Sequence, residues 1–354
     1  MPHDQSPTAR PIVTIASPLE ARHVERIAAA ANGRIDLRYR PDLLPQPRYV
    51  GDHGDPAWRR TPAQQAEWRA MLANADVLWD LPHGEPADLL AVAPRARWIQ
   101  TTSAGVGPAV QRLGLAASDV IVTTASGIHA QPLTEFVFAA LLYWTKQIPH
   151  LLAEQRAHRW ERYCASELDG QTMAIVGPGR VGREVGRIAR AFGMRVWAMA
   201  RRNDPARAAE LGVDRLFGRG ELHAMLAAAD CLVLATPQTP ETAGLIGASE
   251  ISALKPGAVV VNIARGSVLD EDALIAALRS GQVGFAALDV ARVEPLPADS
   301  PLWDMPNVLI SPHSASTVEG ENAKLVERFV ANLEHFLAGR YDRLAPQLDK
   351  QRGY

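Results

Sequence analysis

A glycine-rich turn between an apolar run and a helical segment is the feature of this 354-residue chain that most restricts its fold. The run Met173–Val176 has the pattern of a buried strand and leads directly into Gly177-Pro178-Gly179-Arg180-Val181-Gly182. In this context Gly177 permits a tight turn, Gly179 lets the backbone approach a pyrophosphate, and Gly182 lets the helix pack against the strand. The helix N-terminus adds unpaired N–H donors for an anion. The turn therefore predicts a dinucleotide-binding βαβ unit.

Strand and helix patterns alternate along the rest of this region. A helix is predicted over Val181–Phe192, where Gly193 closes it. Further strands are predicted at Val196–Ala200, Cys231–Leu234, Val259–Ile263, Phe285–Val290 and Val308–Ile310. Such alternation requires a parallel sheet that is covered by helices on both faces.

A second, smaller α/β pattern precedes this region. Its predicted elements are strands at Pro11–Ala16, Ile35–Tyr39, Ala75–Trp79, Trp98–Thr101 and Val120–Thr123, helices at Leu19–Ala31 and Pro62–Ala73, and a long loop at Arg40–Thr61. A long helix over Pro132–Ala153 should cross between the domains, and an amphipathic helix over Thr317–Leu337 should return to the first one.

These patterns predict a two-domain α/β protein. A doubly wound parallel-sheet Rossmann domain at residues 125–315 would be inserted into a smaller, flavodoxin-like α/β domain made of residues 10–124 and 316–354. A ligand would be expected in the cleft between the two domains.

Composition excludes several classes of protein. The chain is 47% hydrophobic and 21% charged, and its formal net charge of −2 offers no basic surface for nucleic acid. No apolar stretch approaches the ~20 residues that span a bilayer, so we expect no membrane insertion. The polar start Met1–Arg10 is unlike a secretion signal or a transit peptide, which predicts a cytoplasmic protein.

The cysteines and histidines predict neither disulfides nor metals. Cys164 and Cys231 are the two cysteines, and Cys231 lies in an apolar run where a thiol packs as a small hydrophobe. The histidines that lack partner ligands at zinc-site spacing are His23, His158 and His223. Asp270-Glu271-Asp272 precedes an apolar helical pattern and is interpreted as a helix N-cap with an acidic first turn.

The end of the second predicted Rossmann strand bears on the choice of dinucleotide. NAD-binding versions carry an acidic residue there for the ribose, whereas this chain has Ala200-Arg201-Arg202. Two guanidiniums can grip a 2′-phosphate, so the sequence favours NADP(H), with NAD(H) possible. The alternative is that Arg201 and Arg202 are solvated surface charges.

Three segments with chemically useful side chains follow successive predicted strands. They carry Arg265, Glu294 and His313, and in a doubly wound sheet they would share the edge that binds ligands. A guanidinium can hold a carboxylate and polarise a ketone, an imidazole can donate a proton, and a carboxylate can orient the imidazole. These are the groups that hydride transfer to a 2-oxo acid requires. Taken singly, each is equally compatible with a surface or loop residue.

From about Trp98 to Ala315 the chain resembles the D-2-hydroxyacid dehydrogenase family. The resemblance is carried, besides the glycine-rich turn and the three catalytic segments, by Thr102-Ser103-Ala104-Gly105-Val106, Leu133-Thr134-Glu135, Leu168 with Gly170, and Thr239-Pro240-Glu241-Thr242. It implies that Arg265 binds the substrate carboxylate and carbonyl, that His313 is the acid/base, and that Glu294 is its hydrogen-bonded partner.

The same resemblance implies the remaining contacts. Backbone N–H groups around Ser103, Ala104, Gly105 and Val106 would complete the carboxylate site, and Asp289 would hold the nicotinamide carboxamide. The residues implied beside the cofactor are Arg180, Val181, Thr236, Pro237, Thr242, Ile263 and Ala264.

The resemblance leaves two functions open. The first is an NADP(H)-linked reductase of a small 2-oxo acid, or dehydrogenase of the 2-hydroxy acid, similar to glyoxylate/hydroxypyruvate reductases. The alternative is a dinucleotide-sensing regulator, because transcriptional corepressors share this fold. The family also implies a homodimer, with Pro132–Ala153 as the interface. The sequence does not predict which 2-oxo or 2-hydroxy acid is used, since the first domain, and Arg40–Thr61 in particular, matches the family least.

Overall fold

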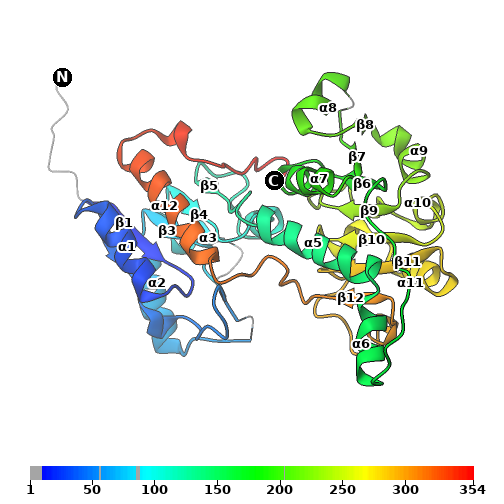
Figure 1. Ribbon diagram of the computed structural model, residues 1–354. Helices are drawn as coiled ribbons and strands as arrows, with labels where there is room; N and C mark the ends of the chain where they lie inside the picture. The colour runs from blue at the N-terminus through cyan, green and yellow to red at the C-terminus, as the bar shows by residue number, and fades with distance from the viewer. Residues whose placement is uncertain (1–9, 56, 85–87, 203) are drawn as a thin grey trace. The chain divides into compact units, whose positions relative to one another are not determined.

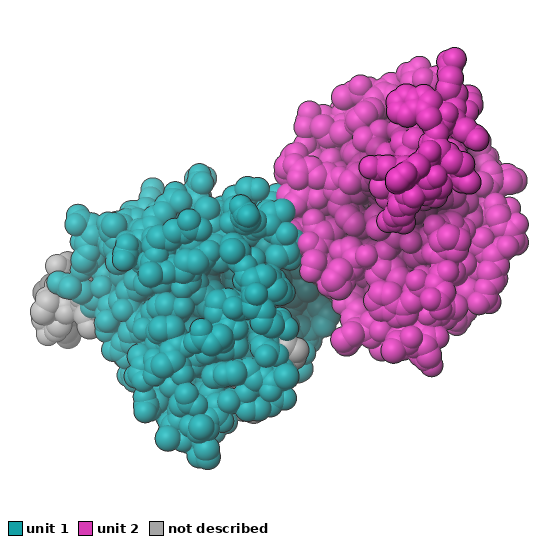
Figure 2. All heavy atoms as spheres, turned by 60° about the horizontal axis from the view of Figure 1, so that its bottom comes forward, with its two compact units in different colours: residues 1–128, 317–354 teal, residues 129–316 magenta. Residues whose placement is uncertain are grey.

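A computed structural model describes residues 10–55, 57–84, 88–202 and 204–354. The chain forms two compact units (Figure 2). Unit 1 comprises the described residues up to Ile128 together with Thr317–Tyr354, and unit 2 is His129–Ser316. The second unit is therefore an insertion in the sequence of the first.

Unit 1 is built on a five-stranded parallel sheet. Its strands are β1 (Ile12–Ile15), β2 (Asp36–Arg38), β3 (Val77–Trp79), β4 (Trp98–Gln100) and β5 (Ile121–Thr123). They lie in the order β2-β1-β3-β4-β5 and all pair in parallel. This is the flavodoxin-like order, as predicted.

Helices cover both faces of this sheet. One face carries α1 (Ala21–Ala31) and α12 (Glu321–Leu337), and the other carries α2 (Pro62–Leu72), α3 (Leu89–Val92) and α4 (Gly107–Arg112). Phe329 of α12 stacks on Trp98 of β4 with ring centroids 5.0 Å apart. The C-terminal helix thus completes the core of the N-terminal sheet, as its amphipathic pattern predicts.

Unit 2 is built on a seven-stranded parallel sheet. Its strands are β6 (Thr172–Val176), β7 (Arg195–Met199), β8 (Arg215–Phe217), β9 (Cys231–Leu234), β10 (Ala258–Asn262), β11 (Val283–Leu288) and β12 (Val308–Ile310). The order β12-β11-β10-β9-β6-β7-β8 reverses direction between β6 and β9 (Figure 1). This is the Rossmann order, and ligands bind such sheets at the reversal point. The predicted fold class is confirmed.

Alternate residues of the unit 2 strands enter two different cores. Met173 and Ile175 pack beneath α5 (Ala130–Thr145) and α7 (Arg180–Ala191), whereas Ala174 and Val176 face the opposite core. The helices of that opposite side are α9 (Leu222–Leu226), α10 (Ala248–Ser252) and α11 (Glu271–Ser280). Unit 2 also contains α6 (Ile148–Arg156) and α8 (Pro205–Leu211). Short 3-10 turns occupy Pro41–Leu43, Arg219–Glu221, Gly266–Val268, Pro301–Asp304 and Tyr341–Arg343.

The single helix predicted over Pro132–Ala153 is wrong. The segment forms α5 and α6 with a break at Gln147, whose φ of 53° is left-handed. Pro149 has no N–H to donate to the Thr145 carbonyl, which instead accepts from the Ser166 N–H at 3.2 Å. A proline inside an apolar helical pattern therefore ends one helix and starts the next.

Smaller departures concern element ends. The strand β8 was not predicted, because it is only three residues long and begins with Arg215. The helices α1 and α12 begin two and four residues later than predicted, at Ala21 and Glu321. Helix ends are set by local capping, which a hydrophobic pattern locates poorly.

Two local predictions, the cap of α11 and the burial of Cys231, are confirmed. Asp270 caps α11, since its side chain accepts from the Ala273 N–H at 3.1 Å. Cys231 is buried with its thiol free, and burial raises its pKa. Within the described ranges, no helix is long and apolar enough to cross a membrane.

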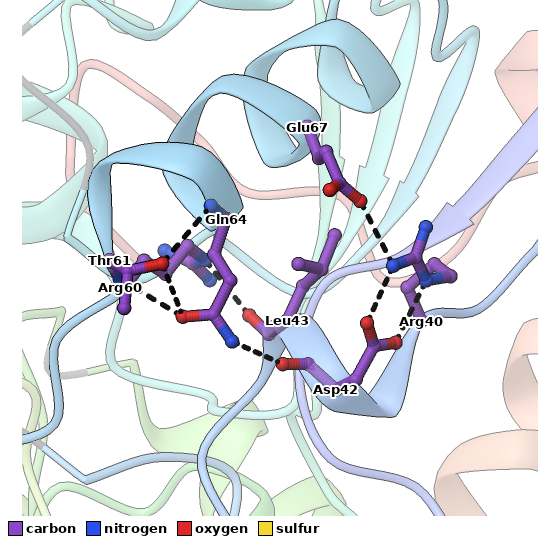
Figure 3. A network of polar contacts seen from close by, with 7 residues as sticks. All are labelled: Arg40, Asp42, Leu43, Arg60, Thr61, Gln64 and Glu67. Atoms are coloured by element: carbon purple, nitrogen blue, oxygen red, sulfur yellow. Dashed lines mark hydrogen bonds and ion pairs between the residues drawn. The ribbon is translucent and has the colours of Figure 1, made fainter.

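The predicted loop Arg40–Thr61 is tied to α2 at both of its ends (Figure 3). The Arg60 Nε donates to the Leu43 carbonyl at 2.8 Å, and the Gln64 side chain donates to the Asp42 carbonyl at 3.0 Å. Thr61 also caps α2 through a capping box with Gln64. The ends of the loop are thus fixed by hydrogen bonds although the loop has little regular structure.

Candidate active site

The three glycines of the turn after β6 occupy three different environments. Gly177 has a φ of 95°, and a Cβ there would lie 2.8 Å from the Thr236 Cα. A Cβ on Gly182 would lie 2.4 Å from the Gly177 carbonyl oxygen. By contrast, a Cβ on Gly179, the N-cap of α7, would meet no atom within 4 Å. The turn is therefore packed tightly below and open above the helix N-terminus, as a bound pyrophosphate requires.

The residues after β7 and β9 border the same edge. Arg201 and Arg202 are both exposed, and the next carboxylate, Asp204, accepts from the Ala206 N–H as the cap of α8. The Thr242 hydroxyl donates to the Pro237 carbonyl at 2.7 Å and so closes the turn after β9. In sequence, no acidic residue comes between the end of β7 and Asp204. The pKa of Glu241 is lowered by its hydrogen bond to Thr239 and, in part, by the charge of Arg201, so a carboxylate does lie near this arginine.

The turn after β10 positions a half-buried guanidinium. The Asn262 side chain accepts from the Ala264 N–H at 3.0 Å and donates to the Arg265 carbonyl at 3.2 Å. One Arg265 Nη donates to the Ala264 carbonyl at 2.6 Å. Burial lowers the pKa of Arg265, while the charges of Glu294 and Asp289 act in the opposite direction. Among the residues with described positions, no carboxylate lies within ion-pair distance of this guanidinium.

An imidazole–carboxylate pair follows the next two strands. The His313 Nδ1 lies 2.8 Å from the Glu294 Oε2, and the Glu294 Oε1 accepts from the Ala291 N–H at 3.2 Å. The His313 backbone is left-handed, with a φ of 55°, and its N–H donates to the Asp289 carbonyl at 2.8 Å. Both ends of the histidine are thereby fixed.

Asp289 connects the ends of β11 and β12. It is 3% exposed, and its Oδ1 accepts from the Ser311 hydroxyl at 2.6 Å and the Ala315 N–H at 2.9 Å. Burial raises the pKa of Asp289, against the effect of these hydrogen bonds and of His313. A cavity of about 380 Å³ lies beside it and is lined in part by Glu294 and His313.

The predicted carboxylate-binding turn lies in unit 1. Ser103, Ala104 and Gly105 are exposed directly after β4, whereas Val106 is buried. The Ser103 carbonyl accepts hydrogen bonds from Thr101 and Ala125, which also belong to unit 1. Unit 2 brings together the ends of β10, β11 and β12, which carry Arg265, Asp289 and His313.

Two organising side chains, Asn262 and Ser311, were not predicted from the sequence. Asn262 shapes the turn that presents Arg265, and Ser311 binds the Asp289 carboxylate. The signal was present in each case, because each polar residue directly follows a buried apolar strand. Such positions favour side chains that bond to the backbone of the following turn.

The fold and the glycine-rich turn define unit 2 as a dinucleotide-binding domain of the Rossmann class. The family model for the D-isomer specific 2-hydroxyacid dehydrogenase NAD binding domain matches residues 138–315. The chain belongs to this family, and unit 2 contains its NAD binding domain. The predicted family and dinucleotide cofactor are thus confirmed.

Individual relatives agree with this assignment. The chain is 39% identical over 239 residues to the D-3-phosphoglycerate dehydrogenase of Mycobacterium tuberculosis, a match that covers 67% of this chain and 44% of that protein. The matched part thus spans less than half of the curated relative. The names of the relatives are those of enzymes, so nothing in them favours the regulatory alternative.

Solved structures match along nearly the whole chain. A family member from Aeromonas salmonicida has a TM-score of 0.76 and 30% identity, covering 97% of this chain and 100% of that one. One from Xanthobacter autotrophicus, in complex with NADPH and MES, has a TM-score of 0.75 and 30% identity over 98% and 100%. An NADPH-dependent glyoxylate/hydroxypyruvate reductase from Sinorhizobium meliloti has a TM-score of 0.76 and 25% identity over 97% and 100%.

Proposed function

We propose that this protein is an NADP(H)-dependent oxidoreductase that interconverts a small 2-oxo acid and its D-2-hydroxy acid. The observation that carries this proposal is the half-buried guanidinium of Arg265, which has no ion-pair partner among the described residues and lies at the sheet edge that also holds the His313–Glu294 pair. A buried charge normally has a partner, so this guanidinium is suited to an anionic ligand.

Each of the three side chains has a distinct role in the proposed reaction. Arg265 binds the substrate carboxylate and polarises the adjacent carbonyl. The His313 Nε2–H donates a proton to the carbonyl oxygen during reduction and takes it back during oxidation. Glu294 holds the imidazole through Nδ1. The bound dinucleotide supplies or accepts the hydride.

The remaining contacts are proposed on the same basis. The exposed backbone of Ser103–Gly105 meets the substrate carboxylate, and Asp289 holds the nicotinamide end of the cofactor. The open turn at Gly179 takes the pyrophosphate, since it leaves room above the helix N-terminus. Loss of NADPH absorbance on mixing with glyoxylate, hydroxypyruvate or a bulkier 2-oxo acid tests the proposal. If the protein oxidised NADPH with none of these acids, the proposal would be refuted.

The preference for NADP(H) is testable through the two arginines after β7. Replacing Arg201 and Arg202 together by alanine should lower the ratio of kcat/KM with NADPH to that with NADH by at least about tenfold, because the 2′-phosphate loses its charge-assisted contacts. Steady-state kinetics with both cofactors measures this ratio. The matched control replaces Arg183 and Arg187 of α7, and should leave the ratio unchanged. An equal loss with both cofactors would show that the arginines support only the fold.

A homodimer is proposed through α6 and the segment after it. The helix α6 buries none of its residues within the chain, and Leu151, Leu152, Trp160 and Tyr163 are exposed by 39%, 40%, 98% and 40%. An apolar surface of this kind favours contact with a second copy. Replacing Leu151 and Leu152 by aspartate should halve the molecular mass measured by light scattering. Val50→Asp, at another exposed apolar residue, is the control, and an unchanged mass for the double variant would exclude this interface.

A further inference from the structure

Asp80, directly after β3, is a buried carboxylate in a left-handed backbone conformation. It is 6% exposed and has a φ of 70°. Its Oδ1 accepts from the N–H of Leu81 at 2.8 Å and of Thr102 at 3.3 Å, and its Oδ2 accepts from the Thr102 hydroxyl at 2.8 Å. A non-glycine residue at this φ is unfavourable, so the contacts of the side chain must hold it there.

These contacts fix the start of the exposed turn after β4. Thr102 is 4% exposed and is held by Asp80 through both its backbone N–H and its hydroxyl. The Ser103 carbonyl then accepts from the Thr101 hydroxyl at 2.7 Å and the Ala125 N–H at 3.1 Å. Ser103, Ala104 and Gly105 are exposed, and Val106 is buried again. The position of this exposed turn thus depends on anchors that include Asp80.

A partly buried histidine, His53, lies beside Glu321 of α12, and the charges of Asp80 and Asp52 also act on it. The His53 Nε2 lies 3.8 Å from the Glu321 Oε1 of α12. Burial acts to lower the pKa of His53, but Glu321, Asp80 and Asp52 together outweigh it and leave the pKa raised. Asp52 is itself held by Arg48, whose Nε lies 2.8 Å away. Among the described residues, Glu321 is the carboxylate within ion-pair distance of His53, and Asp80 and Asp52 act on its pKa through their charges.

We propose that Asp80 is a positioning residue for the turn Ser103–Gly105. The inference rests on the proposed function, in which this turn meets the substrate carboxylate.

The kinetic test removes the carboxylate without adding backbone strain. Asp80→Gly accepts the positive φ freely, so its effect reports the lost hydrogen bonds. The KM for the 2-oxo acid should rise at least about tenfold, with the KM for NADPH unchanged. Asp80→Asn keeps an acceptor for the Thr102 N–H and should restore most of the loss. An unchanged KM in Asp80→Gly would overturn the proposal.

The matched control is Asp76, a buried carboxylate at the opposite end of β3. It accepts from the Ile12 N–H at 2.8 Å and from Arg95 at 3.1 Å, and makes no contact with Thr102. Asp76→Ala should lower the melting temperature without raising the KM for the 2-oxo acid. If Asp76→Ala raised that KM as much as Asp80→Gly, the effect would be one of general stability and not of positioning.

Hydrogen exchange separates this inference from the proposed function. Amide exchange over Thr102–Val106, measured without substrate, should become faster in Asp80→Gly and remain as in the wild type in Asp76→Ala. This readout does not depend on turnover. A wild-type protein that reduces no 2-oxo acid would refute the proposed function only, whereas unchanged exchange in Asp80→Gly would refute the positioning role.

The pair of His53 and Glu321 gives a separate prediction with a pH signature. Because the pKa of His53 is raised in the folded protein, its stabilising effect is present at acidic pH and is lost as the pH rises through the raised pKa. The difference in melting temperature between the wild type and His53→Gln should therefore shrink as the pH rises. Glu321, Asp80 and Asp52 are the carboxylates that raise this pKa. A difference that is constant with pH would show that His53 is not the cationic partner of Glu321.

Discussion

Replacing His313 by alanine should reduce the turnover of the 2-oxo acid by about 10²- to 10⁴-fold, the share that a positioned general acid usually contributes. The imidazole is fixed at Nδ1 by Glu294 at 2.8 Å and by a backbone N–H bond to the Asp289 carbonyl. No other side chain in the proposed mechanism can donate a proton to the carbonyl oxygen. Steady-state kcat under saturating NADPH measures the loss, and the Kd for NADPH should stay close to that of the wild type.

Two further variants test whether the loss of turnover is specific to the His313 imidazole. Glu294→Gln keeps a hydrogen-bonding group but removes the charge that holds the imidazole, so it should lower kcat by less than His313→Ala does. His223 also pairs with a glutamate of unit 2, Glu250, at 3.0 Å. His223→Ala is therefore a control for the loss of a surface His–Glu pair and should leave kcat unchanged. If His313→Ala kept nearly the full rate, the assignment of the acid would be wrong.

The glycine-rich turn and the strand ends could be predicted because they depend on local rules. A strand, a turn and a helix in sequence set the position of Gly177, Gly179 and Gly182. The carboxyl ends of parallel strands lie at one edge of a sheet, so residues after β10 and β12 share that edge. The contact between His313 and Glu294 agrees with this reasoning.

The cluster around Asp80 could not be predicted in the same way. His53 and Glu321 belong to opposite parts of the chain, and their approach depends on α12 returning to the sheet of unit 1. Asp80 directly follows a buried strand, but nothing in the sequence indicates that its partner is Thr102. The break at Gln147 is a third case, because a proline near the middle of an apolar pattern can kink a helix or end it.

Arg265→Ala should lower kcat/KM for the 2-oxo acid by about 10²- to 10⁴-fold. A guanidinium can make two charge-assisted hydrogen bonds to a carboxylate, each worth about 1.5–3 kcal/mol, and each factor of ten requires about 1.4 kcal/mol. The side chain is half-buried, which keeps water from replacing these bonds fully. Both KM and kcat should suffer, because the guanidinium binds the carboxylate and also orients the carbonyl for hydride attack.

The control for this substitution is Arg292→Ala, two residues before Glu294 in sequence. The Arg292 guanidinium is exposed by 52% and is already paired with Asp272 at 2.6 Å, so its loss should leave kcat/KM nearly unchanged. Arg265→Lys keeps the charge but not the planar fork, and should recover substrate binding more than turnover. Free guanidinium added to Arg265→Ala should restore part of the rate, because the ion can enter the space left by the missing side chain and bind the substrate carboxylate there. A variant that loses NADPH binding as strongly as turnover would show instead that Arg265 supports the cofactor side of the site.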